Sequence, residues 1–233
     1  MVDPISIITT IANPKEWIEA ITTGVRAWRG VSVLAFGTTR VGKSTLWKYL
    51  ETGQPADSTT ISKTMEVTPV GDGKFRLHNV SVYGIKVALK GLDVPGHLEM
   101  RSVWKDVLQL AKPRAIIFIL DHAADTGPDG SVNAPNPERL REHHQAFEYL
   151  RDLILSDAEV CKNLRALLFL ANKSDVWPRE VSYHQLLRQS QIPSLYDRLQ
   201  EIKHLTIRAN HCSALYGTNV QEEIRWIVQN TGG

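Results

Sequence analysis

The stretch Gly37-Thr-Thr-Arg-Val-Gly-Lys-Ser44 matches the G-x-x-x-x-G-K-[ST] pattern of a phosphate-binding loop. The run before the loop, Val31–Phe36, is apolar like a buried strand, and the segment after it, Thr45–Tyr49, contains no helix breaker. The loop therefore has its required strand–loop–helix setting. In such a loop, backbone N–H groups and the positive end of the next helix face a phosphate. We expect Lys43 to reach the β- and γ-phosphates of a nucleoside triphosphate and Ser44 to ligate Mg²⁺. The predicted phosphate-binding residues are Gly37, Thr38, Thr39, Arg40, Val41, Gly42, Lys43, Ser44 and Thr45.

A second motif predicts which base is bound. Asn172-Lys-Ser-Asp175 follows the apolar run 166–171 and has the N-K-x-D form with which P-loop GTPases read guanine. The Asp175 carboxylate can accept from N1–H and from the exocyclic N2–H of guanine, a donor pair that adenine lacks. We expect the stem of Lys173 to lie along the base, and the backbone of Ser213-Ala214 to support O6. The predicted base-binding residues are Asn172, Lys173, Asp175, Ser213 and Ala214.

Between these motifs lies Asp93-Val-Pro-Gly96-His97, of the form D-x-x-G. We expect Asp93 to bind Mg²⁺ through a water molecule and the N–H of Gly96 to sense the γ-phosphate. His97 is the candidate catalytic residue, because it is the side chain in the water-positioning place after Gly96 and hydrolysis needs an oriented water molecule. A solvated histidine on a loop is the alternative interpretation.

A threonine of the first switch segment is expected to complete the metal shell. Thr59, Thr60 and Thr64 all follow Lys43 at a suitable distance along the chain. We favour Thr64, because it directly precedes a strand signal, and place Thr60 second. The predicted metal ligands are therefore Ser44, Thr64 and Asp93.

The order of these motifs resembles that of small P-loop GTPases, and it is most similar to the Arf/Sar branch of the Ras-like superfamily. The segment Gly96–Lys105 resembles the second switch of that branch, with its Arg and Trp at matching places. The strand 116–121 and the loops 169–175 and 212–220 are also similar, so that the resemblance covers about Val31–Gln229.

The resemblance implies an α/β fold, the three-layer P-loop GTPase domain, with a mostly parallel sheet between two layers of helices. It also implies GTP/GDP and Mg²⁺ as ligands, slow hydrolysis of GTP, and partners that include a protein effector and activating or exchange proteins. We therefore expect a GTP-binding molecular switch.

The chain departs from the Arf pattern at the second switch. Pro95-Gly96-His97 replaces Gly-Gly-Gln and is the form found in translation-factor GTPases, and Leu92 replaces a Trp. The loop between Asp121 and Pro137 is also longer than usual. A nucleotide-binding scaffold with little turnover and a translation-factor-like GTPase stay open as alternatives. A nucleotide kinase would make the two base motifs coincidences.

Hydrophobic periodicity predicts alternating strands and helices, hence a mostly parallel sheet covered on both faces. The expected strands are 31–36, 115–120, 166–171 and 204–209, and the expected helices are 43–52, 98–110, 137–156, 183–188 and 194–203. Strand signals at 64–92 are broken by Gly71-Asp-Gly73, which predicts a hairpin turn. The last helix is expected to begin with Thr218 as N-cap and Gln221 completing a capping box.

Three further side chains are assigned to the surface. Arg40 is expected to point to solvent or a partner rather than to supply charge to the phosphates, because the loop binds through its backbone. His143 and His144 are expected on the surface of their helix, because neighbouring positions do not face one ligand.

Residues 1–30 lie outside the minimal GTPase domain, which we place at 31–233. Trp17, Ile18, Ile21, Val25 and Trp28 recur at helical spacing and predict an amphipathic helix. Its polar face carries both acidic and basic residues, whereas lipid-binding helices are rich in Lys and Arg. We therefore favour packing against protein over contact with a membrane.

Composition fits one globular domain. Of 233 residues, 42% are hydrophobic and 22% charged, and the net charge of +2 argues against a nucleic-acid partner. Cys161 and Cys212 are expected to be reduced thiols. There is no long apolar run, signal peptide, myristoylation glycine or prenylation cysteine in the sequence. We expect a cytoplasmic protein, with peripheral membrane association as the alternative.

Overall fold

A computed structural model describes residues 31–55, 77–82, 85–93, 96, 101–122, 136–177 and 181–232. Strands 77–82 and 85–93 are described by their backbone alone.

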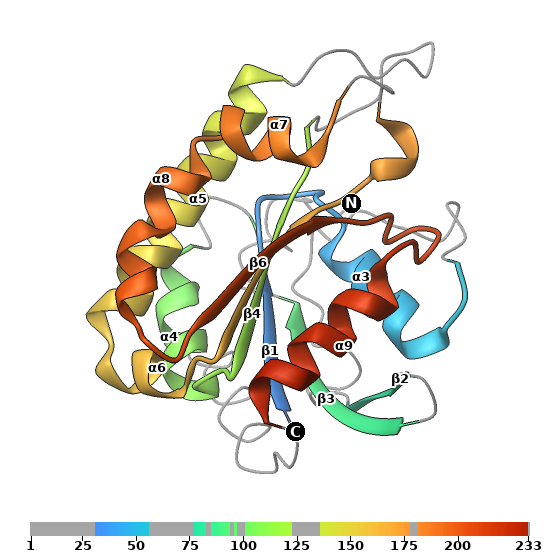
Figure 1. Cartoon of the computed structure of the whole chain (residues 1–233), viewed down its shortest axis with the longest axis horizontal. Helices are drawn as coiled ribbons and strands as arrows, with labels where there is room; N and C mark the ends of the chain where they lie inside the picture. Colours follow the sequence, from blue (N-terminus) through green and yellow to red (C-terminus); the bar gives the residue numbers. More distant parts are fainter. Residues whose placement is uncertain are drawn as a thin grey trace, which may run out of the picture.

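The described chain is built on a six-stranded sheet of order β2-β3-β1-β4-β5-β6 (Figure 1). Strands β2 and β3 are antiparallel, and every other neighbouring pair is parallel. The three central strands are buried along their whole length, as expected for parallel strands covered on both faces. The strands are β1 (Val31–Phe36), β2 (Leu77–Val82), β3 (Ile85–Asp93), β4 (Ala115–Leu120), β5 (Ala166–Ala171) and β6 (Thr206–His211).

Helices cover both faces of the sheet (Figure 1). Side chains of β1 alternate between the layers: Leu34 and Phe36 pack towards α4 and α5, while Val33 and Ala35 pack towards α3 and α9. One layer consists of α3 (Lys43–Thr52) and α9 (Val220–Thr231). The other consists of α4 (Ser102–Ala111), α5 (Pro137–Ser156), α6 (Ala158–Asn163), α7 (Tyr183–Gln189) and α8 (Ile192–Tyr196). The three-layer α/β fold expected from the sequence is confirmed.

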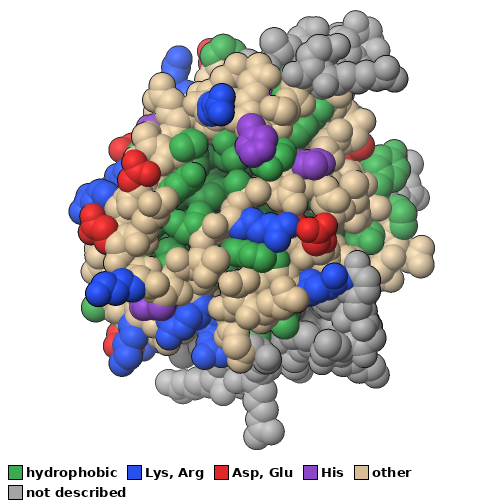
Figure 2. All heavy atoms as spheres, in the orientation of Figure 1, with side chains coloured by type: hydrophobic (Ala, Val, Ile, Leu, Met, Phe, Trp, Pro, Cys, Tyr) green, Lys and Arg blue, Asp and Glu red, His purple; other side chains and the backbone are tan. Residues whose placement is uncertain are grey.

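Two short 3₁₀ helices, η3 (Ser174–Val176) and η4 (Asp197–Glu201), complete the described elements. Strand β6 is the edge of the sheet, and its side chains are mostly half-buried. The face that carries β6 shows apolar side chains in a hollow, with Lys, Arg and His around it (Figure 2). Among the described helices, none is both long and apolar enough to cross a membrane.

Several expected boundaries agree with the structure and others do not. The bounds of β1, α3, β4, α5 and β5 are as predicted, since long apolar runs and a Pro at the start of α5 mark them clearly. Strand β6 begins two residues later than predicted, and α6 was not predicted. Strands β2 and β3 pair as far as Val82 with Ile85, whereas Gly71-Asp-Gly73, residues 1–30 and 123–135 lie outside the described residues.

The predicted N-cap of the last helix is wrong. Helix α9 begins at Val220, and its N-cap position is Asn219, which has a φ of 61°. Thr218 instead forms an isolated β-bridge with Ser213. The pairing of Thr218 with the loop after β6 therefore overrides the local capping signal, and the N-cap lies one residue later than predicted.

The first prediction concerns the core around Phe147 of α5. Its ring packs edge-on against Phe118 and Phe169, with centroids 5.1 and 4.7 Å away, and it is fully buried. Phe147→Ala should lower the free energy of unfolding by about 3–5 kcal/mol, because it removes buried apolar surface and leaves a cavity. Urea denaturation measures this. Gln145→Ala, at an exposed position of the same helix, should stay within about 0.5 kcal/mol of wild type, and an equal loss in both variants would contradict the assignment.

Candidate functional site

The predicted site residues that the structure describes lie at the carboxyl edge of the sheet (Figure 1). The loop 37–42 follows β1, Asp93 ends β3, Asp121 follows β4, and the loops 172–175 and 212–219 follow β5 and β6. Because parallel strands end at the same edge, segments far apart in sequence meet there, which is where open α/β sheets bind their ligands.

The phosphate loop is held by its own lysine. Lys43 is the first residue of α3 and is buried, and its Nζ donates to the carbonyl of Gly37 at 3.1 Å and to that of Thr38 at 2.9 Å. No side chain caps the start of α3, whose N-cap position is Gly42. The first N–H groups of the helix therefore face the loop without a capping oxygen, which favours an anion there.

Two glycines allow close contact between backbones and side chains at this loop. Gly42 has a φ of 93°, and a Cβ at this position would collide with the side-chain amide of Asn172. A Cβ on Gly96 would collide with the backbone of Gly37 and Thr38. The glycine of the D-x-x-G motif therefore lies directly against the phosphate loop, as a sensor of the phosphate end would have to.

Asn172 connects three loops of the site. Its Nδ2 donates to the carbonyl of Val41 at 2.7 Å, and its Oδ1 accepts from the backbone N–H of Ala214 at 2.8 Å. The thiol of Cys212 also donates to Oδ1, at 3.3 Å. The side chain is buried. One amide thus holds the phosphate loop and the loop after β6 together, and the carboxylate of Asp175, three residues on, is exposed.

The carboxylate of Asp121 is the most heavily paired charge at this edge. Oδ1 accepts from Arg139 Nε at 2.7 Å, Oδ2 lies 2.6 Å from Lys173 Nζ, and His143 Nε2 lies 3.2 Å from Oδ1. Burial by itself raises the pKa of the Asp121 carboxyl, but the hydrogen bond with His143 and the charges of Arg139 and Lys173 outweigh it and hold the pKa well below its usual range. Asp121 is therefore ionised.

Helix α5 connects this carboxylate to the phosphate loop. Arg139 Nη2 donates to the carbonyl of Thr39 at 2.6 Å, and His143 Nδ1 lies 3.2 Å from the hydroxyl of Thr38. The prediction that His143 lies on the helix surface is wrong, because its side chain is fully buried. His144 is half-buried, and its Nδ1 lies 3.1 Å from the carbonyl of Ser190.

Helical spacing offers a signal for the polar pair that sequence reasoning missed. Arg139, His143 and Phe147 recur every four residues and therefore share one face of α5. Since Phe147 belongs to the buried face, this spacing indicates that Arg139 and His143 are buried as well. The roles of Asp121, Arg139 and His143 were not predicted, since the identity of their partners depends on loops distant in sequence.

The structure brings together the phosphate loop, Gly96 and the base-motif residues. Arg40 is exposed, as predicted. The side chains of His97 and of Thr59, Thr60 and Thr64 lie outside the described residues, and Asp93 is described by its backbone, which pairs in register with Ala35. Within the ranges that the structure describes, there is no group of three or more His, Cys, Asp or Glu side chains suited to a metal ion.

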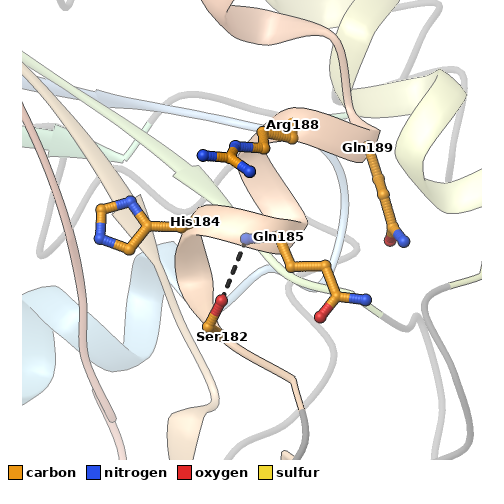
Figure 3. A pocket seen from close by; sticks show the side chains of 5 residues that line it. All are labelled: Ser182, His184, Gln185, Arg188 and Gln189. Atoms are coloured by element: carbon orange, nitrogen blue, oxygen red, sulfur yellow. Dashed lines mark hydrogen bonds between the residues drawn. The ribbon is translucent and has the colours of Figure 1, made fainter.

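A separate pocket lies on α7 and is lined by Ser182, His184, Gln185, Arg188 and Gln189 (Figure 3). Ser182 accepts a hydrogen bond from the N–H of Gln185 at 3.2 Å and so caps this helix. None of the five residues belongs to the motifs, and we assign no ligand to this pocket.

The architecture and the convergent loops define a GTP-binding protein of the small-GTPase class. The family model of the ADP-ribosylation factor (Arf) family matches residues 19–231, and the chain belongs to this family. Members of the Arf family are GTPases. A comparison with curated protein sequences gives no match.

Solved structures share the fold at low sequence identity. The Arl6 BBS3 small GTPase of Trypanosoma brucei, bound to the analogue GppNp, is 18% identical with a TM-score of 0.54, over 87% of this chain and 97% of that one. The signal recognition particle receptor SRb of Chaetomium thermophilum, in its GDP–Mg form, is 18% identical with a TM-score of 0.50, over 87% of this chain and 100% of that one. A bacterial selenocysteine-specific elongation factor, EF-Sec, is 16% identical with a TM-score of 0.50, over 88% of this chain and 29% of that one.

The second prediction is a pH dependence that arises from Asp121. A carboxyl whose folded pKa is depressed stabilises the fold above its unfolded pKa, about 3.9, and loses that contribution as the pH falls towards the folded value. The free energy of unfolding should therefore fall as the pH drops from about 5 towards 2, and fall less steeply in Asp121→Asn. At pH 6 that variant should be less stable by about 3–5 kcal/mol, since the buried guanidinium of Arg139 loses its anionic partner.

Urea denaturation at each pH measures both effects. Asp157→Asn is the matched control for the loss of one carboxyl, because Asn is as good an N-cap as Asp for α6. Parallel pH profiles of wild type and Asp121→Asn would show that the Asp121 carboxylate is not preferentially stabilised in the fold.

Proposed function

We propose that this protein is a molecular switch that binds GTP, hydrolyses it slowly to GDP and phosphate, and controls a protein effector through its two switch segments. The observation that carries the proposal is the contact of Gly96 with the phosphate loop, together with the amide of Asn172 that holds this loop to the loop after β6. The first contact supports a role of Gly96 in sensing a terminal phosphate. The second supports a fixed spacing between the phosphate loop and the base loops.

The proposed contacts with the nucleotide follow from the arrangement of donors and acceptors. Backbone N–H groups of 37–45 and the ammonium group of Lys43 would bind the phosphates, since Lys43 already lies over the loop carbonyls. Asp175 would accept two hydrogen bonds from guanine, and the stem of Lys173 would lie along the base, with its Nζ held by Asp121. Ser213 and Ala214 would support O6 by their backbone.

Mg²⁺ fits the oxygen ligands that the chain offers. Ser44 follows Lys43 at the start of α3, and Asp93 ends β3 beside β1, so both belong to segments that flank the phosphate loop. Hydroxyl and carboxylate oxygens are the ligands that this hard cation prefers. We propose Ser44, Asp93 and Thr64 as the residues that would hold the ion, which supplies neutralisation of phosphate charge.

In the proposed reaction, the oxygen of a water molecule attacks the γ-phosphorus as the bond from that phosphorus to the β–γ bridging oxygen breaks. The protein's contribution is positioning and charge stabilisation. We propose His97 as the side chain that orients the water molecule, with a ring nitrogen as acceptor. Activating and exchange proteins would then set the rate of the cycle, and no nucleic acid takes part.

The segment 1–30 would add a helical extension to the GTPase domain at 31–233. The family match begins at residue 19, within this segment. Its balanced charge favours contact with protein, and membrane contact is the less favoured proposal. We propose that the protein acts in the cytoplasm.

The third prediction is guanine specificity through Asp175. Asp175→Asn replaces a carboxylate oxygen, which accepts, by an amide N–H, which donates. Since xanthine has a carbonyl where guanine has its amino group, preference should move from guanosine to xanthosine nucleotides. A site built to hydrogen-bond a group rejects its absence by roughly 10⁴-fold or more. Competition of GTP, XTP and ATP against a fluorescent guanine nucleotide measures this, with Asp152→Asn, an exposed carboxyl on α5, as control. Equal affinity of the wild type for ATP and GTP would contradict the assignment of guanine recognition to Asp175.

The fourth prediction concerns turnover and separates a switch from a nucleotide-binding scaffold. The isolated chain should hydrolyse GTP on the order of 10⁻⁴ to 10⁻² s⁻¹, as this class does without a supplied arginine. His97→Ala should be slower still with nearly unchanged GTP affinity, the pattern of a group that acts in the transition state. Single-turnover cleavage at matched occupancy measures both. No turnover by the wild type would favour the scaffold, and identical non-zero rates would remove His97 from the mechanism.

A further inference from the structure

A continuous polar chain runs beneath the site from the phosphate loop to the base loop. It begins at the hydroxyl of Thr38, which lies 3.2 Å from His143 Nδ1. His143 Nε2 lies 2.7 Å from the carbonyl oxygen of Asp121, whose carboxylate in turn lies 2.6 Å from Lys173 Nζ. Thr38, His143 and Asp121 are all buried.

The contacts of His143 specify which ring nitrogen carries the proton. Nε2 lies 2.7 Å from the carbonyl oxygen of Asp121 and 3.2 Å from both Oδ1 and the backbone N of that residue. Because the shortest of these contacts is with a carbonyl, which can only accept, we assign the proton to Nε2. Nδ1 is then left as an acceptor, and the Thr38 hydroxyl donates to it. Burial lowers the pKa of His143, which agrees with a neutral ring. The two hydrogen bonds therefore fix the orientation of the imidazole, which links Asp121 to the hydroxyl of Thr38.

Thr38 is a residue whose displacement would reach the phosphate contacts directly. Its carbonyl accepts from Lys43 Nζ at 2.9 Å, and its backbone lies against Gly96. A shift of Thr38 would thus move the support of the phosphate lysine and the surface on which the D-x-x-G glycine rests. At the other end of the chain, Asp121 holds Lys173, the lysine of the base loop.

We propose that His143 is a positioning residue for nucleotide retention: anchored by Asp121, it holds Thr38 and so sets the phosphate loop relative to the base loop. The proposal rests on the proposed roles of Lys43 and Lys173 in nucleotide binding. Arg139 is a second connection between the same elements, through the carbonyl of Thr39 at 2.6 Å. Loss of His143 should therefore loosen the loop without destroying it.

The test is the release of a fluorescent GDP from the full chain in the presence of Mg²⁺ and excess GDP. His143→Ala and Thr38→Val should each speed release by about 5–30-fold, the effect of losing one or two kcal/mol of stabilisation. Val has the shape of Thr without the hydroxyl, and Thr38→Ser, which keeps the hydroxyl, should release GDP more slowly than Thr38→Val. His144→Ala is the matched control on the same helix, since His144 contacts Ser190 instead.

The double variant separates positioning from a merely structural role. If His143 acts through Thr38, Thr38→Val with His143→Ala should release GDP no faster than the faster single variant, because both changes remove one interaction. If His143 only stabilises the fold, the two effects multiply and Thr38→Ser gives no rescue, which overturns the proposal. Wild-type release from Thr38→Val also overturns it, even where His143→Ala fails to fold.

Failure of the proposed function gives a different result in the same assay. A wild type that takes up no guanine nucleotide would overturn the switch itself. If the wild type binds GDP but the effects of Thr38→Val and His143→Ala on its release multiply, only the role of His143 is overturned.

Discussion

An ionised carboxylate that is fully buried must be paired, and the pairing of Asp121 shapes this site. Removing such a group from water costs on the order of several kcal/mol, which only well-placed opposite charges and hydrogen bonds offset. Arg139 and Lys173 supply the charges, and Nε2 of His143 supplies a further hydrogen bond to Oδ1. Since these residues come from α5 and from the loop after β5, the requirement brings both elements against the end of β4.

The same requirement gives the phosphate loop its rigidity. Arg139 and His143 reach past Asp121 to the carbonyl of Thr39 and the hydroxyl of Thr38. From the opposite side, Asn172 holds the carbonyl of Val41. The loop is therefore held at three neighbouring residues, and its N–H groups can be ordered before any ligand arrives, which reduces the entropy lost on binding. The entropy of ordering this loop is thus lost largely on folding rather than on ligand binding.

The second switch is where this chain differs most from the pattern it resembles. Gly96 keeps the backbone contact with the phosphate loop, but Pro95 and His97 flank it in place of Gly and Gln. The glycine is required by sterics, because a Cβ would collide with two backbones. The steric constraint therefore acts at Gly96 itself, where the D-x-x-G segment meets the phosphate loop.

By itself, the sequence determined the elements that local patterns encode. Apolar runs gave β1, β4 and β5, an Asn-Pro start gave α5, and the spacing of Gly42, Lys43 and Ser44 indicated phosphate binding, because these signals act over a few residues. The N-cap of α9 was predicted wrongly, since Thr218 pairs with Ser213 rather than capping a helix. Strand β6 was predicted, but it begins two residues later than expected. Only the tertiary structure decided what Asp121, Arg139 and His143 do. The imidazole of His143 meets a hydroxyl 105 residues away along the chain, and a contact of that range exists only because parallel strands end at one edge and bring their loops together.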